Sequence, residues 1–311
     1  MKKPIKSIFS GKNRTIGVVA TAGKADMQQY HTVAGELAAA GIKLKNYLPE
    51  AAADTPSYLA ASPEQRIEKF NQALNDPEVE LLICLRGGFG SVHLLEYIDY
   101  PLWRQRQLPL MGYSDVTSLH CAMLANDIYP AISGSNFISL LQVLDDDLSS
   151  TSHSAALTSE DSICEIILPE NTLRAVLPDS ENTPLCARAY AANLTVLSSL
   201  CGSSFMPDFQ DMILIIEDVN EPVYKIDRML CQLQLNGVFK KTAAVVFGSF
   251  TGELDHKELA GLFERIARQL PCPVWKDFPF GHTFPMCAVN AGKYLTIQCD
   301  RLQISSTQIC S

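Results

Sequence analysis

The sequence predicts an α/β protein with a parallel sheet in its N-terminal part and a second, smaller unit after it. First, β-branched apolar runs alternate with segments of helical periodicity through residues 1–130, which is typical of a parallel sheet with helices on both faces. Second, a polar, serine-rich stretch starts at Asp145, and a new apolar unit begins near Leu185. Third, the chain has 311 residues, whereas one core usually organises about 150.

Strands and helices alternate along the first unit. We expect strands at residues 16–20, 42–47, 80–85, 108–112 and 128–132. We expect helices at residues 27–40, 63–75, 91–97 and 116–126. In the second of these helices Pro63 suits the first turn, and Ile67, Phe70 and Leu74 fall on one face. Active sites on such sheets lie outside the carboxyl ends of the strands.

The second unit begins near Leu185. We expect it to contain strands at 213–217, 243–250 and 294–298 and a helix at 223–235. The polar stretch before it has little periodicity and is the best candidate for a boundary. We therefore divide the chain into an N-terminal domain at 1–148, a linker at 149–180 and a C-terminal domain at 181–311.

The charge balance argues against nucleic acid and membranes as partners. Lys and Arg total 25 while Asp and Glu total 34, which gives a formal net charge of −9 and argues against a strongly basic face. The sequence has no run of about 18 apolar residues, so we expect no membrane-spanning helix. The apolar stretch at 16–22 is better explained as a buried first strand than as a signal peptide.

The ten cysteines are scattered without a CxxC pair, and several lie inside apolar runs. Because a chain of this length can form a core without disulfides, we expect reduced thiols and a cytoplasmic location. Neither HExxH nor a paired Cys/His spacing occurs, so the sequence supports no zinc site.

The turn at 111–115 is the most informative local feature. An apolar strand leads into it and an amphipathic helix leads out, so Ser114 would be lifted clear of the sheet beside the unpaired N–H groups that begin the helix. Such amides can stabilise the oxyanion of an acyl transfer. The alternative is that Ser114 or Asp115 only caps the helix, and the GxSxG motif itself is absent.

A second turn, at 86–91, follows a buried strand and is rich in glycine. Glycine permits a positive φ and a close approach of a ligand to the backbone. Neither GxGxxG nor GxxxxGK[ST] fits it, so a nucleotide loop is not indicated. The turn is either a plain tight turn or a second source of N–H groups beside Ser114.

One carboxylate and one histidine complete the candidates. Glu217 ends an apolar strand, where a carboxylate can orient a histidine, although Asp218 or Glu221 could equally favour the next helix. His282 lies in a loop bracketed by Pro279 and Pro285, and loops held in this way often carry function. A lone loop histidine can also be simply exposed.

Four blocks closely resemble the LD-carboxypeptidases, serine peptidases that trim murein peptides, and the related microcin C immunity peptidases. They are CLRGGFGS at 84–91, GYSDVTSL at 112–119, IIEDVNEPVYKIDRMLCQ at 215–232 and FPFGHT at 278–283. The blocks occur in the family's order and at its approximate spacings, so the resemblance covers nearly the whole chain. One departure is that Ala191 and Ala192 precede Asn193-Leu194, where many relatives carry two glycines.

The resemblance implies a role for each candidate residue. Ser114 would be the nucleophile, His282 the general base and acid, and Glu217 the carboxylate that orients the imidazole. The backbone N–H groups of Gly88 and Asp115 would form the oxyanion hole. The family's architecture implies a flavodoxin-like, class I amidotransferase-like N-terminal domain carrying the nucleophile, and a smaller β-rich C-terminal domain carrying Glu217 and His282. No metal or organic cofactor is implied.

The usual family reaction releases the terminal D-alanine from cytoplasmic murein tetrapeptides during cell-wall recycling. We therefore expect a small peptide as the partner, and a homodimer because relatives often form one. A related alternative is a microcin-immunity-type peptidase that cleaves aminoacyl-nucleotide antibiotics. A non-catalytic peptide-binding protein would be expected to lack Ser114, Glu217 or His282, and a glutamine amidotransferase would need a cysteine in place of Ser114.

Overall fold

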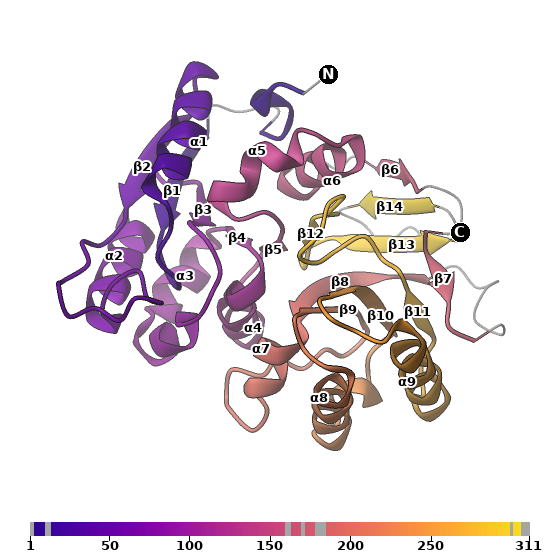
Figure 1. Ribbon diagram of the computed structural model, residues 1–311. Helices are drawn as coiled ribbons and strands as arrows, with labels where there is room; N and C mark the ends of the chain where they lie inside the picture. The colour runs from indigo at the N-terminus through magenta and orange to yellow at the C-terminus, as the bar shows by residue number, and fades with distance from the viewer. Residues whose placement is uncertain are drawn as a thin grey trace.

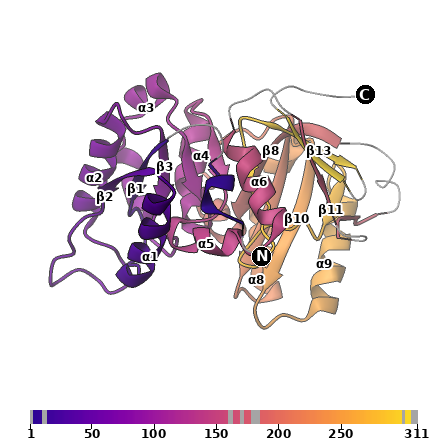
Figure 2. The ribbon, with the colours of Figure 1, turned by 90° about the horizontal axis from the view of Figure 1, so that it is seen from above.

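The computed structural model shows two sheets that lie side by side, one in each half of the chain (Figure 1). It describes residues 3–9, 14–158, 163–168, 172–177, 185–298 and 301–305. Seen from above, the N-terminal half occupies one side of the molecule and the C-terminal half the other (Figure 2). The predicted α/β class is confirmed.

The first sheet has the order β12-β5-β4-β3-β1-β2. Its parallel strands are β1 (Thr15–Val19), β2 (Lys43–Tyr47), β3 (Leu81–Cys84), β4 (Leu110–Gly112) and β5 (Ala131–Ser133). β12 (Val289–Asn290) comes from the C-terminal half and pairs antiparallel with β5. Strands β1, β3 and β4 lie inside the sheet and are buried along their whole length, which explains their continuous apolar runs.

Helices cover both faces of this sheet. They are α1 (Met27–Ala39), α2 (Pro63–Asn75), α3 (Tyr100–Arg106), α4 (Thr117–Ala125) and α5 (Leu140–Val143), with 3-10 helices at Ile5–Ser7, Ser91–Tyr97 (η2), Ser114–Val116 (η3) and Phe137–Ser139. α2 begins as its sequence indicates, because Ser62 and Gln65 form a capping box and Pro63 occupies the first turn. The predicted helix at 91–97 is a 3-10 helix, and α3 was not predicted.

The second sheet has the order β6-β14-β13-β8-β9-β10-β11-β7. Its parallel strands are β8 (Leu185–Asn193), β9 (Met212–Val219), β10 (Ala244–Thr251) and β11 (Val274–Lys276). Antiparallel strands complete it: β6 (Cys164–Ile167), β7 (Arg174–Ala175), β13 (Tyr294–Gln298) and β14 (Arg301–Ser305). Its helices are α7 (Leu194–Ser199), α8 (Val223–Leu235), α9 (His256–Gln269) and a 3-10 turn at Val238–Lys240.

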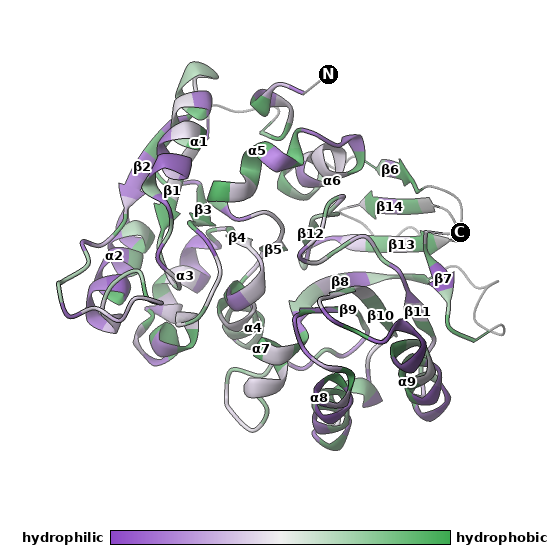
Figure 3. Ribbon diagram, viewed as in Figure 1, coloured by the Kyte–Doolittle hydropathy of each residue, from purple (hydrophilic) through white to green (hydrophobic). Residues whose placement is uncertain are grey.

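The largest apolar core joins the two halves. It runs from Phe70, Leu82 and Leu119 in the first half to Leu214 and Phe247 in the second. Figure 3 shows that β9 and β10 are mainly hydrophobic, that β2 is mainly hydrophilic, and that α8 and α9 carry both hydrophobic and hydrophilic residues. Because this core is shared, the carboxyl ends of both parallel sheets are held in a constant relation to each other.

The serine-rich stretch assigned to the linker starts as a helix, α6 (Asp147–Leu157), which lies between the two sheets (Figures 1 and 2). Its hydroxyls are buried. Ser149 Oγ accepts from the N–H of Met286 at 2.9 Å, and Ser152 Oγ accepts from that of Ala288 at 3.0 Å. The composition suggests a loop, but the hydroxyls bind a distant segment of backbone.

Strands β6 and β7 also fall inside the expected linker, at 164–167 and 174–175. Its residues 159–162, 169–171 and 178–180 lie outside the described residues. The division into domains at 148 and 181 stays a prediction. None of the helices in the described ranges is long and apolar enough to cross a membrane.

Candidate active site

Ser114 lies at a sharp turn between β4 and α4, at the carboxyl end of the first sheet. Its φ of +67° is in the left-handed region, which is uncommon and strained for a residue with a side chain. The preceding Gly112 allows the turn, since a Cβ there would meet Asn136 Oδ1 and Val116 Cγ2 at 2.9 Å. A strained strand-to-helix turn that exposes a serine is the geometry of a nucleophile elbow.

The strain at position 114 predicts an unusual order of stabilities. Ser114→Gly is expected to be more stable than Ser114→Ala by about 1 kcal/mol, because glycine adopts a positive φ without the Cβ penalty. Thermal or urea unfolding of the two variants measures this difference. An alanine variant as stable as the glycine variant would argue against strain at the turn.

The structure brings Ser114, His282 and Glu217 together from three separate segments. The Ser114 hydroxyl donates to His282 Nε2 at 3.1 Å, and His282 Nδ1–H donates to Glu217 Oε2 at 2.8 Å. Within the described part of the chain, no side-chain hydrogen bond caps η3 or α4, and the Ser114 hydroxyl instead contacts the imidazole. The bond to Glu217 selects the tautomer of His282 whose Nε2 is free to accept a proton.

Burial and hydrogen bonding together shift the pKa values of Glu217 and His282. Glu217 is fully buried, which raises the pKa of its carboxyl, while the hydrogen bond and charge of His282 act in the opposite direction. Burial of His282 opposes its charged form, but the hydrogen bond and charge of Glu217, with Asp218 behind it, outweigh this effect. The pKa of His282 is therefore raised.

Asn193 connects Glu217 to the helix that follows the nucleophile. Its side-chain N–H₂ donates to Glu217 Oε1 and to Asp218 Oδ1, both at 3.1 Å. Its backbone N–H donates to Thr117 Oγ1 at 3.0 Å, and Thr117 begins α4. The sequence patterns predict no role for Asn193, although its place before a short helix is a signal for a capping side chain.

The loop that carries His282 packs tightly on the end of β10. A Cβ at Gly248 would lie 2.5 Å from the carbonyl oxygen of Phe280, and one at Gly281 would lie 3.0 Å from Glu217 Oε2. Gly281 also has a φ of +144°. The loop is further tied by a hydrogen bond between the hydroxyls of Ser249 and Thr283 at 3.0 Å. Glycine at these positions therefore lets the imidazole approach Glu217.

The glycine-rich turn at 86–91 lies directly against the nucleophile. A Cβ at Gly87 would fall 2.8 Å from Ser114 Cβ, so only glycine fits there. Gly88, with a φ of +116°, is the next residue. Asp115 follows Ser114 and starts the helical turn, and its carboxylate accepts from the N–H of Ser91 at 2.8 Å. The two candidate oxyanion donors, Gly88 and Asp115, thus belong to segments that meet at Ser114.

Two other histidines that the sequence offers are buried structural residues. His120 Nε2 donates to the Leu110 carbonyl at 3.2 Å, and His153 Nδ1 donates to that of Ser149 at 2.7 Å. Burial lowers the pKa of each to about 4. Within the described residues, no cluster of three or more Cys, His, Asp or Glu side chains could hold a metal ion.

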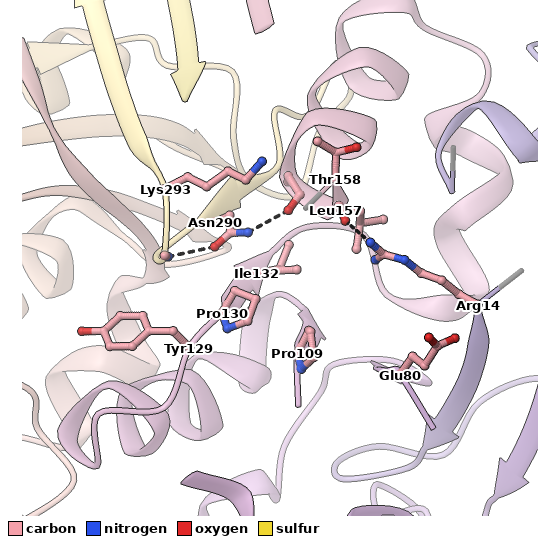
Figure 4. A pocket seen from close by; sticks show the side chains of 12 residues that line it. Arg14, Glu80, Pro109, Tyr129, Pro130, Ile132, Leu157, Thr158, Asn290 and Lys293 are labelled. Carbon is pink, nitrogen blue, oxygen red and sulfur yellow. Dashed lines mark hydrogen bonds between the residues drawn. The ribbon is translucent and has the colours of Figure 1, made fainter. Parts of the chain in front are cut away.

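A cavity of about 440 Å³ lies at the other edge of the first sheet (Figure 4). Its lining includes Glu80, Pro109 and Pro130, which precede β3, β4 and β5. It is therefore at the amino ends of the strands, away from Ser114. Sites in parallel sheets form at the carboxyl ends, where the three side chains meet.

Family models match both halves of the chain. The LD-carboxypeptidase N-terminal domain matches residues 16–134, and the LD-carboxypeptidase C-terminal domain matches residues 187–297. A probable murein peptide carboxypeptidase of Bacillus subtilis is 29% identical over 301 residues, covering 93% of this chain and 92% of that protein. A murein tetrapeptide carboxypeptidase of Pseudomonas aeruginosa is 30% identical over 253 residues, covering 79% of this chain and 81% of that protein.

The microcin C7 self-immunity protein MccF of Escherichia coli is 26% identical over 279 residues, covering 83% of this chain and 82% of that protein. A solved structure of MccF shares the fold, with a TM-score of 0.82 at 22% identity over 96% of this chain and 98% of the other. The chain therefore belongs to the LD-carboxypeptidase family and is a peptidase of the serine type.

Proposed function

We propose that the chain releases the terminal D-alanine from murein tetrapeptides, in the recycling of cell-wall peptides in the cytoplasm. The observation that carries the proposal is the line of hydrogen bonds from Ser114 through His282 to Glu217, which suits acyl transfer. The murein-peptide names of two relatives support the substrate. Assembly as a homodimer stays a prediction.

Acylation uses each of these groups. Ser114 Oγ attacks the carbonyl carbon between the L-centre of the diamino acid and D-alanine, while His282 Nε2 takes the hydroxyl proton. Glu217 stabilises the imidazolium that forms. The N–H groups of Gly88 and Asp115 donate to the oxyanion. The C–N bond breaks as His282 gives its proton to the amine, which releases D-alanine and leaves an ester on Ser114.

Deacylation reverses the proton movements with water as the nucleophile. His282 takes a proton from water, and the hydroxide attacks the ester carbonyl. The bond to Ser114 Oγ breaks, and His282 returns the proton to this oxygen. The tripeptide leaves with a new terminal carboxylate, and the enzyme regains its starting state.

The raised pKa of His282 predicts the acid side of the pH profile. Since Nε2 must be unprotonated to act as the base, kcat/KM is expected to fall with an apparent pKa above the ordinary 6.5 of histidine. Initial rates of D-alanine release between about pH 5 and 9 measure this value. An acid limb at or below 6.5 would contradict the arrangement of charges around His282.

The same shift has a consequence of opposite sign for stability. The folded state favours the imidazolium, so this contribution to the free energy of unfolding is present below pH 6.5. It is lost as the pH rises through the raised pKa. Activity and this contribution to stability therefore change in opposite directions over the same pH interval.

The direct test is D-alanine release from L-Ala–γ-D-Glu–meso-diaminopimelate–D-Ala by the purified protein, with Ser114→Ala as the blank. The same peptide ending in L-alanine is the matched control, since the proposed site takes an L-to-D bond. Release from the first peptide alone is expected. If no D-alanine is released while Ser114 still reacts with a serine-directed fluorophosphonate, the proposed substrate is wrong. The assignment as a serine-type enzyme would still hold.

The second candidate is cleavage of an aminoacyl-nucleotide. One observation favours it: Phe89, next to Gly88, is 48% exposed and lies 6.1 Å from the ring of Tyr58, so an aromatic face is available for a base. Hydrolysis of an aminoacyl adenylate analogue is measured beside the tetrapeptide. If only the nucleotide is cleaved, and Phe89→Ala weakens its binding, this function replaces the first.

A further inference from the structure

Arg66 is a charged residue buried in the first half of the chain, with 1% of its surface exposed. It lies on α2, and its guanidinium donates to four neutral acceptors from three segments of the chain. These are the carbonyl of Thr21, the carbonyls of Ala61 at 3.0 Å and of Gly90 at 2.9 Å, and His93 Nδ1 at 3.1 Å. Burial lowers the pKa of Arg66, and the charge of Asp115 acts in the opposite direction. A cation this costly to bury indicates a specific role.

The Gly90 carbonyl is the acceptor that matters for the site. Gly90 closes the turn that begins at Gly87, and it has a φ of +121°. A Cβ there would lie 2.9 Å from Arg66 Nη1 and 2.7 Å from Leu59 Cδ2. The backbone of Gly90 is therefore in direct contact with the guanidinium, with no room for a side chain between them.

A single peptide unit is held by charges on both sides. The carbonyl oxygen of Gly90 accepts from Arg66, and the N–H of the same peptide, which belongs to Ser91, donates to Asp115 Oδ2 at 2.8 Å. A cation at the oxygen and an anion at the N–H match the dipole of the peptide. The two charges prevent this peptide from rotating, and so define where the turn from Gly87 to Gly90 ends.

The other end of the turn lies against the nucleophile, through the contact of Gly87 with Ser114. We propose that Arg66, together with Asp115, positions the glycine-rich turn so that the N–H of Gly88 points at the oxyanion. Arg66 acts through the Gly90–Ser91 peptide and does not touch substrate. The inference rests on the proposed role of Gly88, and it extends that role to a buried cation on another helix.

The expected effect is on the transition state and not on the binding of substrate. Loss of one oxyanion donor costs on the order of 10² to 10³ in kcat. Arg66→Met removes the charge and every donor, and is expected to lower kcat by about this factor with KM little changed. The affinity for a peptidyl trifluoromethyl ketone, whose hemiketal oxygen occupies the oxyanion hole, is expected to fall in parallel.

A matched control separates positioning from loss of stability. Arg106 on α3 is half-buried and also donates to backbone carbonyls, those of Leu74 and Val79, at the far end of α2. Arg106→Met is expected to lose stability and keep its kcat. Equal losses of kcat in the two variants at equal loss of Tm would overturn the proposal.

Two further variants cover the case in which Arg66→Met does not fold. Gly90→Ala displaces the same peptide and is expected to lower kcat while Arg66 stays in place. In Arg66→Ala, added guanidinium is expected to restore kcat with saturation, whereas sodium chloride of equal ionic strength is not. A kcat for Gly90→Ala equal to that of wild type, or no rescue by guanidinium, would count against Arg66.

The test also distinguishes failure of the inference from failure of the proposed function. If the wild type releases no D-alanine, the rate at which a fluorophosphonate labels Ser114 replaces kcat, because its phosphonyl oxygen also uses the oxyanion hole. Slower labelling of Arg66→Met than of Arg106→Met is then expected. Equal labelling rates would reject the role of Arg66 whatever the substrate is.

Discussion

Ser114→Ala is expected to lower kcat for D-alanine release by on the order of 10⁶, with substrate binding largely kept. The variant removes the oxygen that we propose forms the acyl-enzyme, and it leaves His282 and Glu217 in place. Water cannot substitute efficiently, because the hydroxyl is held 3.1 Å from His282 Nε2 while water must be ordered at each turnover. The measurement is the rate of D-alanine release in a single turnover, under conditions where the wild-type reaction is complete in seconds.

Ser118→Ala is the matched control for this variant. Ser118 is buried one turn later on α4, and its hydroxyl donates to the Asp115 carbonyl at 2.9 Å. It is the same change of residue type about one turn further along the chain, but the oxygen removed bonds to a backbone carbonyl and not to His282. We expect its kcat to stay close to that of the wild type. A large loss in both variants would mean that damage to α4, and not loss of the nucleophile, explains the result.

The sequence predicts the elements of the first sheet because their signals are local. Pro63 and the Ser62–Gln65 pair mark the start of α2, and the apolar runs of the buried strands have no polar interruption. The predicted apolar face of α2 is less accurate. Arg66 is buried, whereas Ile67 is only half-buried, since carbonyls from distant segments attract the guanidinium. Helical periodicity contains no information about such partners.

The same limit applies to the site. From the sequence, the turn at Ser114 could hold a cap or a nucleophile, and the observation that favours the nucleophile is the contact with His282, 168 residues away. Asn193 and the serines of α6 are short polar residues that suggest a cap and a loop. Their hydrogen bonds to Glu217 and to Met286 depend on how the two halves pack together. The family resemblance implies that Ser114, His282 and Glu217 act together because it carries that long-range information.

Glu217→Gln is expected to lower kcat by about 10⁴, the size of effect seen when the carboxylate of a serine-protease triad becomes an amide. Glu217 accepts at both oxygens, from His282 at one and from Asn193 at the other. A glutamine has one oxygen and one N–H₂, so it cannot satisfy both. If its oxygen faces His282, two N–H₂ groups oppose each other at Asn193. If its N–H₂ faces His282, Nδ1 must accept and Nε2 carries the proton.

Asn193 therefore favours the inactive arrangement in Glu217→Gln. The side-chain oxygen of Asn193 accepts from the N–H of Val196 at 3.1 Å, which opposes rotation of its amide. The glutamine then turns its N–H₂ to His282, whose Nε2 becomes a donor and cannot take the proton of Ser114. A proton NMR resonance for the Nδ1–H of His282 is expected in the wild type and is expected to be lost in the variant.

Asp218→Asn is the control, because Asp218 also accepts from Asn193 but does not touch His282. Asp218 acts on His282 only through its charge, so we expect a fall in kcat of roughly tenfold or less and an acid limb moved to lower pH. Adding Asn193→Asp to Glu217→Gln supplies an acceptor for the glutamine N–H₂ and lets the glutamine oxygen face His282, so the double variant is expected to recover part of kcat. A Glu217→Gln variant as active as Asp218→Asn would show that orientation of His282 does not depend on this carboxylate.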